Sequence, residues 1–522
     1  MKSYLVALCG LMTLVSCGQS QPVILPEASR WAPVELKFQA KVEVANPFLV
    51  SFDVMVTTPD GNELCVPGFY DGSDGWKARV MPFASGQWKV VTRSTEPLLN
   101  GRRFEFACAD VAAPLQHGRL RVDAEHPHHF KFEDGSRPYM LAYECDWLWA
   151  LDHGDSTMPK TKAFLDRIGG HGFNTVIVNT FAYDTGWRPG KTEADDLGPP
   201  PAMPWLGTHE KPDFKRLNVA FWQHYDRMMQ ALHERGMIAH VLCKVYNKKV
   251  KWPGRTSEGD ELFFRTLIAR YSAYPGIVWD FSKEAHNEKN LDYKLDRLRY
   301  LRGSDPFHHL VTIHDDDKNY DGGVFDALVD FRTDQQHDKF RAKVLEQRAL
   351  KAWPVMNSEL GYEQGAGGPE DKTYGVVHAP DAFALRAWEV AMADGYTAYY
   401  HTHTAWDVLR TDVNPPGYRL FGFLRQFFET TNYWELSPRP SADGGLWVLE
   451  NPGHEYVLWS ASGKDLRFEL PGGAGNFHVR WFQPLTGEEQ KGQAVTPGNQ
   501  VFTPPPAWAG TPVVLHLKRS NP

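Results

Sequence analysis

Two glutamates stand at the ends of apolar runs that look like buried strands, where a pair of carboxyls could cleave a glycosidic bond. Glu284 follows the run "GIVWDFS" at 276–282, and Glu359 ends the run "WPVMNSE" at 353–359. Cleavage needs one carboxyl that protonates the leaving oxygen and a second, ionised carboxyl at the anomeric carbon. The alternative for Glu284 is a structural role at the start of a following helix. Glu363, which falls in the loop beyond Glu359, is a rival for the second role.

Eight strand-like runs alternate with helical patterns between residues 121 and 432 and would position these carboxyls. The runs cover 139–145, 174–180, 238–244, 276–282, 310–316, 327–333, 353–359 and 397–403. An amphipathic segment at 221–236 ends in Gly236, a typical helix stop. Eight strand–helix units over roughly 265 residues match the usual size of a TIM barrel. We therefore predict an α/β fold with a (β/α)8 barrel, whose site lies at the carboxyl ends of the strands.

Polar and aromatic residues follow the other runs and would line a sugar-binding cleft at the same end of the barrel. The residues that we expect to bind substrate are Asp146, Trp147, Asn179, Lys244, Tyr246, Lys283, His314, Gln336, His337, His401 and Trp406. The loop 181–218 after the second run is long and should face the substrate. Each of these residues alone could instead serve packing, so the prediction depends on their shared position at one end of the barrel.

The regions on either side of the barrel alternate apolar and polar residues with the period of β-strands. We predict an N-terminal β-sandwich at 22–120 and a smaller C-terminal β-sandwich at 437–522. The second could bind glycan or brace the barrel, and we favour bracing.

A glutamate after the fourth strand and another after the seventh resemble the catalytic pair of the clan A retaining glycoside hydrolases. The stretches "GFYDGSDGWKARVMPFASGQWKV", "PVMNSELGYE" and "VRWFQPLTGE" are similar to apiosidase-like and uncharacterised bacterial members of that clan. The resemblance covers nearly all of the chain after residue 17. It implies Glu284 as the acid/base and Glu359 as the nucleophile. It also implies that Trp406 lies under the reactive sugar and that His337 hydrogen-bonds the nucleophile.

One residue departs from the pattern of the clan. The position before the fourth-strand glutamate usually holds an asparagine that contacts the sugar 2-hydroxyl, whereas this chain has Lys283. A lysine could hydrogen-bond a hydroxyl, or it could attract a carboxylate or sulfate group. Lys283 therefore hints at an acidic glycan.

Residues 1–17 have the pattern of an export signal rather than of a folded element. "MKSYLVALCGLMTLVSCGQS" begins with one positive charge and continues with an apolar stretch too short to span a bilayer comfortably. Its end resembles a bacterial lipobox, which implies removal of residues 1–16 and lipidation of Cys17. The alternative is a plain secretory signal. We expect an exported lipoprotein of the outer membrane that contacts the membrane through its lipid alone.

Four cysteines remain after Cys17, and export would place them in an oxidising compartment. Their spacing fits no zinc motif. Cys65 and Cys108 both lie in the first β region and could form a disulfide. Cys145 and Cys243 end apolar runs, so we expect them to be buried thiols.

The composition limits the partners. The chain has 522 residues, 42% apolar and 23% charged, with a net charge of −8 and no long basic run, which argues against nucleic acid. Its 18 Trp and 20 Tyr mildly favour a glycan partner. Neither a G-x-S-x-G elbow nor a phosphate loop is present, and we expect no cofactor. A metal site formed by His314, Asp315, His401 and His403 is a lesser alternative.

Three functions compete on this evidence. The favoured one is a retaining glycoside hydrolase that acts on a polysaccharide or its oligosaccharides. The second is a non-catalytic glycan-binding lipoprotein on the same barrel, which would tend to lose one of the two glutamates. The third is a polysaccharide lyase with a Lys or His base, which would need an acidic substrate and give unsaturated products.

Overall fold

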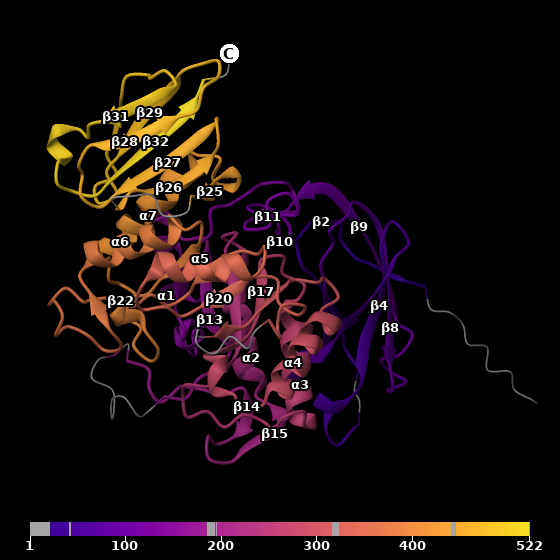
Figure 1. Cartoon of the computed structure of the whole chain (residues 1–522). Coiled ribbons are helices and arrows are strands. Elements are labelled where there is room, and N and C mark those ends of the chain that lie inside the picture. The colour runs from indigo at the N-terminus through magenta and orange to yellow at the C-terminus, as the bar shows by residue number, and fades with distance from the viewer. Residues whose placement is uncertain are drawn as a thin grey trace, which may run out of the picture.

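A closed barrel of parallel strands lies at the centre of the computed structural model, which describes residues 21–40, 43–184, 194, 196–315, 323–439 and 445–520 (Figure 1). Its strands are β12 (Leu141–Glu144), β13 (Thr175–Asn179), β16 (Ile238–Val245), β17 (Ile277–Lys283), β18 (Leu310–Thr312), β19 (His314–Asp315), β20 (Arg332–Asp334), β21 (Val355–Asn357) and β24 (Tyr396–Tyr399). They pair in the order β18-β17-β16-β13-β12-β24-β21-β20-β19. Only Ile313 separates β18 from β19, so these two form one strand and join the ends of the sheet into a barrel.

Helices cover the barrel between successive strands. They are α1 (Pro159–Gly170), α2 (Val219–His233), α3 (Glu258–Tyr271), α4 (Leu291–Ser304), α5 (Phe340–Leu350), α6 (Pro380–Ala391) and α7 (Pro416–Glu429). Several begin at side-chain caps that satisfy free backbone N–H groups. Asn218 accepts from Phe221 before α2, and Asn290 accepts from Tyr293 before α4. Gly236 follows α2 with a φ of 62°, the left-handed conformation expected of a helix stop.

The eight predicted strands are confirmed, and the sixth is shifted. The run at 327–333 is apolar, but its strand begins only at Arg332. The N–H groups of Leu328 and Val329 donate to Phe325 O at 2.7 and 3.1 Å. These turn bonds use donors that a ladder would need. The run therefore forms a turn as far as Val329, and strand pairing begins only at Arg332.

Two β-sheets precede the barrel and share one core. One sheet contains β1 (Val23–Ile24), β2 (Ala28–Arg30), β9 (Arg103–Ala112), β8 (Gly86–Ser94), β4 (Phe52–Thr57) and β5 (Glu63–Pro67), and the other contains β3 (Val34–Phe38), β7 (Trp76–Val80) and β6 (Phe69–Tyr70). Residues from both sheets pack together, and Ala273 and Phe307 of the barrel complete their core. A hairpin of β10 (Leu120–Val122) and β11 (Phe130–Phe132) follows.

The disulfide considered for Cys65 and Cys108 is not formed. Cys65 lies on β5 and Cys108 on β9, with β4 and β8 between these strands. Strands lie about 4.8 Å apart, so three spacings exceed the reach of a disulfide. Cys145 and Cys243 are buried free thiols, as predicted.

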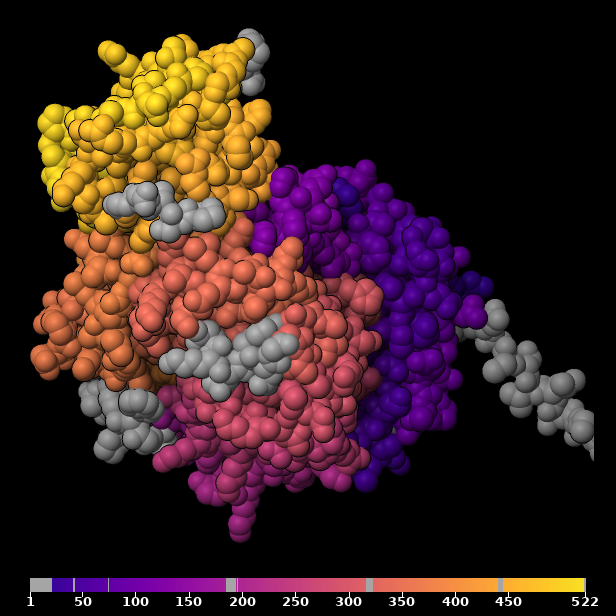
Figure 2. All heavy atoms as spheres, in the orientation of Figure 1, coloured from indigo at the N-terminus to yellow at the C-terminus, as the bar shows by residue number. Residues whose placement is uncertain are grey.

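Two further sheets follow the barrel and again share a core. One contains β25 (Ser437–Pro438), β26 (Trp447–Asn451), β27 (Glu455–Ser460), β32 (Val513–Arg519), β29 (Phe477–Phe482) and β30 (Glu489–Lys491), and the other contains β28 (Leu466–Leu470) and β31 (Gly498–Phe502). Trp459 of β27 stacks on Trp388 of α6 with ring centroids 5.4 Å apart. This C-terminal region sits on one side of the barrel, and the N-terminal sheets flank another (Figure 2).

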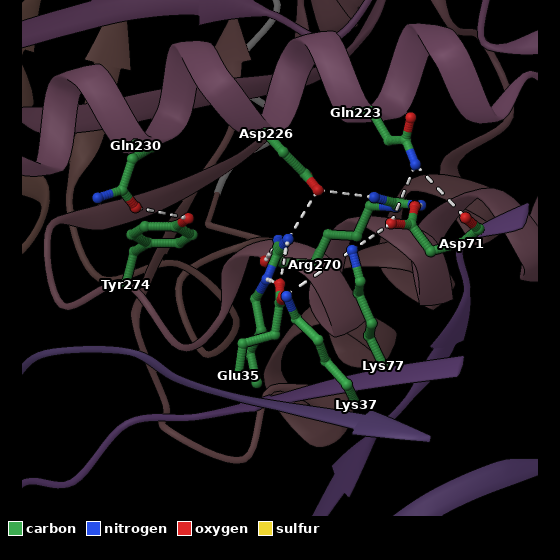
Figure 3. Close-up of polar contacts among 10 residues, drawn as sticks. Glu35, Lys37, Asp71, Lys77, Gln223, Asp226, Gln230, Arg270 and Tyr274 are labelled. Carbon is green, nitrogen blue, oxygen red and sulfur yellow. Dashed lines mark hydrogen bonds and ion pairs between the residues drawn. The ribbon is translucent and has the colours of Figure 1, made fainter. Parts of the chain in front are cut away.

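A buried network of charges joins the N-terminal sheets to α2 and α3 (Figure 3). Arg270 of α3 donates to Asp71 at 2.7 Å and to Asp226 of α2 at 2.8 Å. Lys77 of β7 also donates to Asp71, at 2.6 Å. Burial would raise the pKa of Asp71, but Arg270 and Lys77 lower it to about 2. These contacts fix the first β region against the helical layer.

No described helix is both long and apolar enough to traverse a bilayer. Cys17, the predicted lipidation site, lies outside the described residues.

Candidate active site

Lys283, the last residue of β17, lies at the centre of a buried group of charged side chains. Its Nζ donates to Glu359 Oε2 at 2.7 Å and also to Glu144 Oε1. Burial alone would lower the pKa of an ammonium, but Glu144 and Glu359 raise the pKa of Lys283 well above its usual range. The ammonium therefore stays charged. We call Glu144, Asp146, Lys283 and Glu359 the Lys283 cluster.

Glu359 follows β21 and is held in its ionised form. Its side chain is 6% exposed, and Tyr362 donates its hydroxyl to Oε1 at 3.0 Å. Burial alone would raise the pKa of Glu359, but the ammonium of Lys283 outweighs it and the pKa lies below the usual range. A fixed, ionised carboxylate of this kind can act as a nucleophile.

The end of β12 supplies two more buried carboxyls. Burial raises the pKa of Glu144 well above its usual range, against the opposing effect of Lys283. Asp146 accepts hydrogen bonds from Tyr400 and, at 3.4 Å, from Asn179. The ring of Trp147 packs on Trp149, which donates to Asn179. Asp146, Asn179 and Lys283 are thus brought together as predicted from their strand ends.

Glu284 has a different environment from Glu359, although it follows Lys283 directly. Its φ of 48° lies in the left-handed region, which is strained for a residue with a side chain. Its side chain is 17% exposed. Asn247 donates to Oε1 at 2.7 Å and Asn287 donates to Oε2 at 3.0 Å. These donors are neutral amides, and His286 Nε2 lies 3.8 Å from Oε2. The two glutamates therefore differ in solvent access and in the groups that hydrogen-bond them.

Trp406, which follows β24, lies beside the cluster. Its ring centroid is 5.4 Å from Lys283 Nζ and 4.0 Å from Lys248 Nζ. Lys248 pairs with Asp184 at 2.9 Å. The structure therefore places an aromatic ring next to two ammonium groups, those of Lys283 and Lys248.

The loop after β13 crosses to the loop after β24. Asp196 forms an antiparallel bridge with Val408, and Leu197 N–H donates to Asp407 O at 2.6 Å. Because β13 and β24 lie on either side of β12, this crossing passes the carboxyl end of β12, where Glu144 and Asp146 lie. The loop also holds the hairpin of β14 (Trp205–Gly207) and β15 (Pro212–Leu217).

Lys244 does not join the cluster, which corrects the prediction. Its Nζ donates to Asp260 of α3 and to Tyr293 of α4, both at 2.6 Å. A buried ammonium needs a carboxylate, and Asp260 supplies it from the helical layer. Tyr246 is turned the same way, against Phe281 at 6.0 Å between ring centroids.

The hydrogen bond expected from His337 to Glu359 comes from Tyr362 instead. His337 is exposed, and its Nε2 lies 3.3 Å from the side chain of Gln335. Gln336 is buried, with its N–H donating to Asn357 Oδ1 at 3.3 Å. These two residues follow a strand that begins later than predicted.

The two remaining predicted histidines are buried and neutral. Burial and the charge of Lys283 lower the pKa of His314 well below its usual range. Burial lowers the pKa of His401 to about 3, and its Nδ1 accepts from the N–H of His403 at 3.2 Å. The predicted metal alternative is not assembled. Within the described parts of the chain, the one group of three possible ligands close enough to share an ion is Asp123, Glu125 and His126.

Glu363, the rival of Glu359, has a structural position. It lies in β22 (Tyr362–Glu363), which pairs with β23 (Val377–His378). Its Oε2 accepts from Tyr399 at 2.6 Å, and its Oε1 accepts from Gly417 N–H at 3.1 Å, in the first turn of α7. Burial raises the pKa of Glu363 to about 7.

Sequence reasoning missed Tyr362, Tyr400, Lys248 and Asp184. The first two hold Glu359 and Asp146, and the last two form the pair beside Trp406. Tyr362 stands three residues after Glu359 in the stretch "PVMNSELGYE", and this closeness in sequence could have marked it as a partner. Lys248 and Asp184 lie in loops, where no pattern marks a partner.

A closed barrel of parallel strands, with carboxyl groups at the carboxyl ends of the strands, defines the class of TIM barrels. Within this class the chain belongs to the apiosidase-like family, because the model of the apiosidase-like catalytic domain matches residues 125–435. Residues 27–95 match DUF5060, a domain of unknown function. No curated protein matches the chain.

Solved structures share the fold at low sequence identity. A candidate glycoside hydrolase from Bacteroides vulgatus ATCC 8482 matches with a TM-score of 0.78 and 18% identity, over 95% of this chain and 100% of that one. A glycoside hydrolase family 5 protein from the same organism matches with a TM-score of 0.58 and 16% identity, over 77% of this chain and 93% of that one. These similarities establish the barrel fold.

Proposed function

We propose that this protein is an exported glycoside hydrolase that cleaves a polysaccharide or its oligosaccharides with retention of configuration. Glu284 is the acid/base and Glu359 the nucleophile. The family and the shared fold support glycosidase activity.

The observation that carries this proposal is the contrast between the two glutamates. Lys283 and Tyr362 hold Glu359 as a buried carboxylate. Glu284 is partly exposed and bonded to the amides of Asn247 and Asn287. Acid and nucleophile need such different environments, because one must carry a proton while the other is ionised.

The reaction proceeds in two displacements. Glu359 attacks the anomeric carbon while Glu284 gives its proton to the leaving oxygen, which breaks the glycosidic bond and forms a glycosyl–enzyme ester. Glu284 then takes a proton from water, and the resulting attack on the anomeric carbon releases the sugar and restores Glu359. This mechanism requires the two carboxyls to lie about 5–5.5 Å apart.

The regions around the barrel complete the proposal. Residues 1–17 direct export and lipidation of Cys17, and the lipoprotein resides in the outer membrane. The sheets that flank the barrel form two β-sandwich domains, each supported by one core shared between two sheets. The C-terminal domain braces the barrel through Trp459 and Trp388.

The test uses protein that starts after Cys17 on plant and algal polysaccharides and their oligosaccharides, neutral and acidic. Glu284→Gln and Glu359→Gln should each lose about a hundredfold or more in rate. Glu363→Gln is the matched control and should keep most activity, because Glu363 bonds Tyr399 and Gly417. NMR of the first product should show the anomeric configuration of the substrate.

Three results would contradict the proposal. An inverted product would remove the nucleophile role of Glu359. A larger loss in Glu363→Gln than in Glu359→Gln would transfer the role to the rival. Binding of a glycan without cleavage, equal in all variants, would make the barrel a binding scaffold.

A further inference from the structure

We infer that the sugar residue attacked by Glu359 is uncharged, without a carboxylate or sulfate group. The inference rests on the proposed function and names the substrate class of that site. It reverses the hint of an acidic glycan that Lys283 carries in the sequence.

Lys283 is already neutralised by the protein. Its side chain is fully buried, and two of its three N–H donors go to Glu144 and Glu359. The remaining donor has the rings of Tyr400 and Trp406 nearby, with Nζ 5.5 and 5.4 Å from their centroids. It could reach a sugar hydroxyl, but its charge is balanced by the carboxylate of Glu359.

The second ammonium beside Trp406 is also paired. Lys248 is buried, its side chain 3% exposed, and it lies 2.9 Å from Asp184. Lys248 and Lys283 are the ammonium groups within 5.5 Å of the Trp406 ring in the described residues. Both lysines near this ring are therefore already paired with carboxylates, and neither offers an unpaired positive charge to an anionic group on the sugar.

The cluster holds an excess of acidic groups. Glu144, Asp146 and Glu359 surround one lysine, and Asp184 adds a fourth carboxyl beside the second. A further buried negative charge would cost several kcal/mol without a new partner. The same excess favours the positive charge that develops on the sugar in an oxocarbenium-like transition state.

Buried polar atoms near Lys283 suit hydroxyl groups. In the described part of the chain, Glu144 Oε2 and Trp147 Nε1 are buried without a hydrogen-bond partner. Both groups can exchange hydrogen bonds with hydroxyls, and burial raises the pKa of Glu144 well above its usual range, which disfavours its charged form. Each buried polar atom without a hydrogen bond destabilises the folded protein by about 1–3 kcal/mol. The hydroxyl groups of a bound sugar would supply the missing hydrogen bonds.

The experiment compares substrates that differ only at C6. Wild-type enzyme is given matched 4-nitrophenyl glycosides and glycuronides of the gluco, galacto and manno series, with the pentosides alongside. We expect cleavage of a neutral member, and kcat/KM for its uronide at least about a hundredfold lower. Equal or faster cleavage of the uronide would overturn the inference.

Measurements at high salt distinguish discrimination by the buried cluster from repulsion by the overall negative charge of the protein. The discrimination should persist at 0.5 M NaCl, because buried charges are screened little. Its disappearance would show that surface repulsion caused it and would overturn the inference.

A binding measurement tests the inference even if the protein has no hydrolase activity. If no glycoside is cleaved, saturation-transfer NMR compares binding of the neutral monosaccharides with that of their uronic acids. Binding of the neutral members alone would support the inference even though the protein is no hydrolase. Binding of the uronic acids, or of neither class, would overturn it.

Discussion

Lys283 controls the ionisation of the site at the residue scale. It outweighs the burial that would otherwise raise the pKa of Glu359. In Lys283→Met the largest effect that opposes burial is lost while the hydrogen bond from Tyr362 remains, so the pKa of Glu359 rises and the carboxylate is lost over a wider acid range. We expect kcat/KM at pH 6 to fall by about a hundredfold or more, with its acid limb moved to higher pH.

The measurement is the pH profile of kcat/KM for wild type and Lys283→Met, which does not depend on how much of the variant folds. Lys289→Met is the control, because Lys289 is exposed and donates to the carbonyl of His286. An acid limb that stays in place would mean that Lys283 does not set the charge of Glu359.

At the scale of elements, the loop after β13 matters most for positioning the substrate, because it crosses the carboxyl end of β12. A Cβ at Gly198 would lie 2.5 Å from Asp407 Oδ2 and 3.0 Å from the Asp184 carbonyl oxygen. Gly198→Ala must therefore push this loop away from the loop after β24. We expect kcat/KM to fall by roughly ten- to a hundredfold, because small displacements of positioning groups are costly.

Gly170→Ala is the matched control, since a Cβ there meets nothing within 4 Å. Steady-state kinetics and thermal unfolding of both variants check the prediction. Unchanged kinetics in Gly198→Ala would show that the crossing loop is not needed to position the substrate.

The barrel strands could be predicted from the sequence because each is a short apolar run buried on both faces. The sequence could not predict which way the lysine side chains at the strand ends point. Lys244 and Lys283 both end apolar runs and both are buried. Lys244 turns to Asp260 in α3, and Lys283 turns to Glu144 and Glu359. The position of these carboxylates depends on the folded barrel, which local pattern does not reveal.

At the scale of the whole molecule, the network around Asp71 holds the N-terminal sheets on the barrel. Asp71→Ala leaves Lys77 and Arg270 without a shared carboxylate. Breaking one partner of a buried ion pair costs about 3–5 kcal/mol. The depressed pKa of Asp71 gives stability above its unfolded value of about 3.8, and this stability is lost as the pH falls towards about 2.

Denaturant unfolding at pH 7 checks this loss, and the difference between wild type and Asp71→Ala should shrink when the pH is lowered to 3. Lys37→Ala is the control, because the side chain of Lys37 is 62% exposed and 3.5 Å from Glu35. Such a surface pair contributes at most about 1 kcal/mol. Equal stability of Asp71→Ala and wild type would mean that the network does not bind the two regions together.

Ala273 and Phe307 of the barrel complete the core of the N-terminal sheets, and this affects the order in which the protein folds during synthesis. A ribosome makes Asp71 about 200 residues before Arg270 of α3, a delay of about 10–40 s. During that interval Asp71 lacks Arg270, and the N-terminal core lacks Ala273 and Phe307. The N-terminal sheets are thus made before the barrel but completed only with it, and a chaperone that holds them would act before the barrel exists.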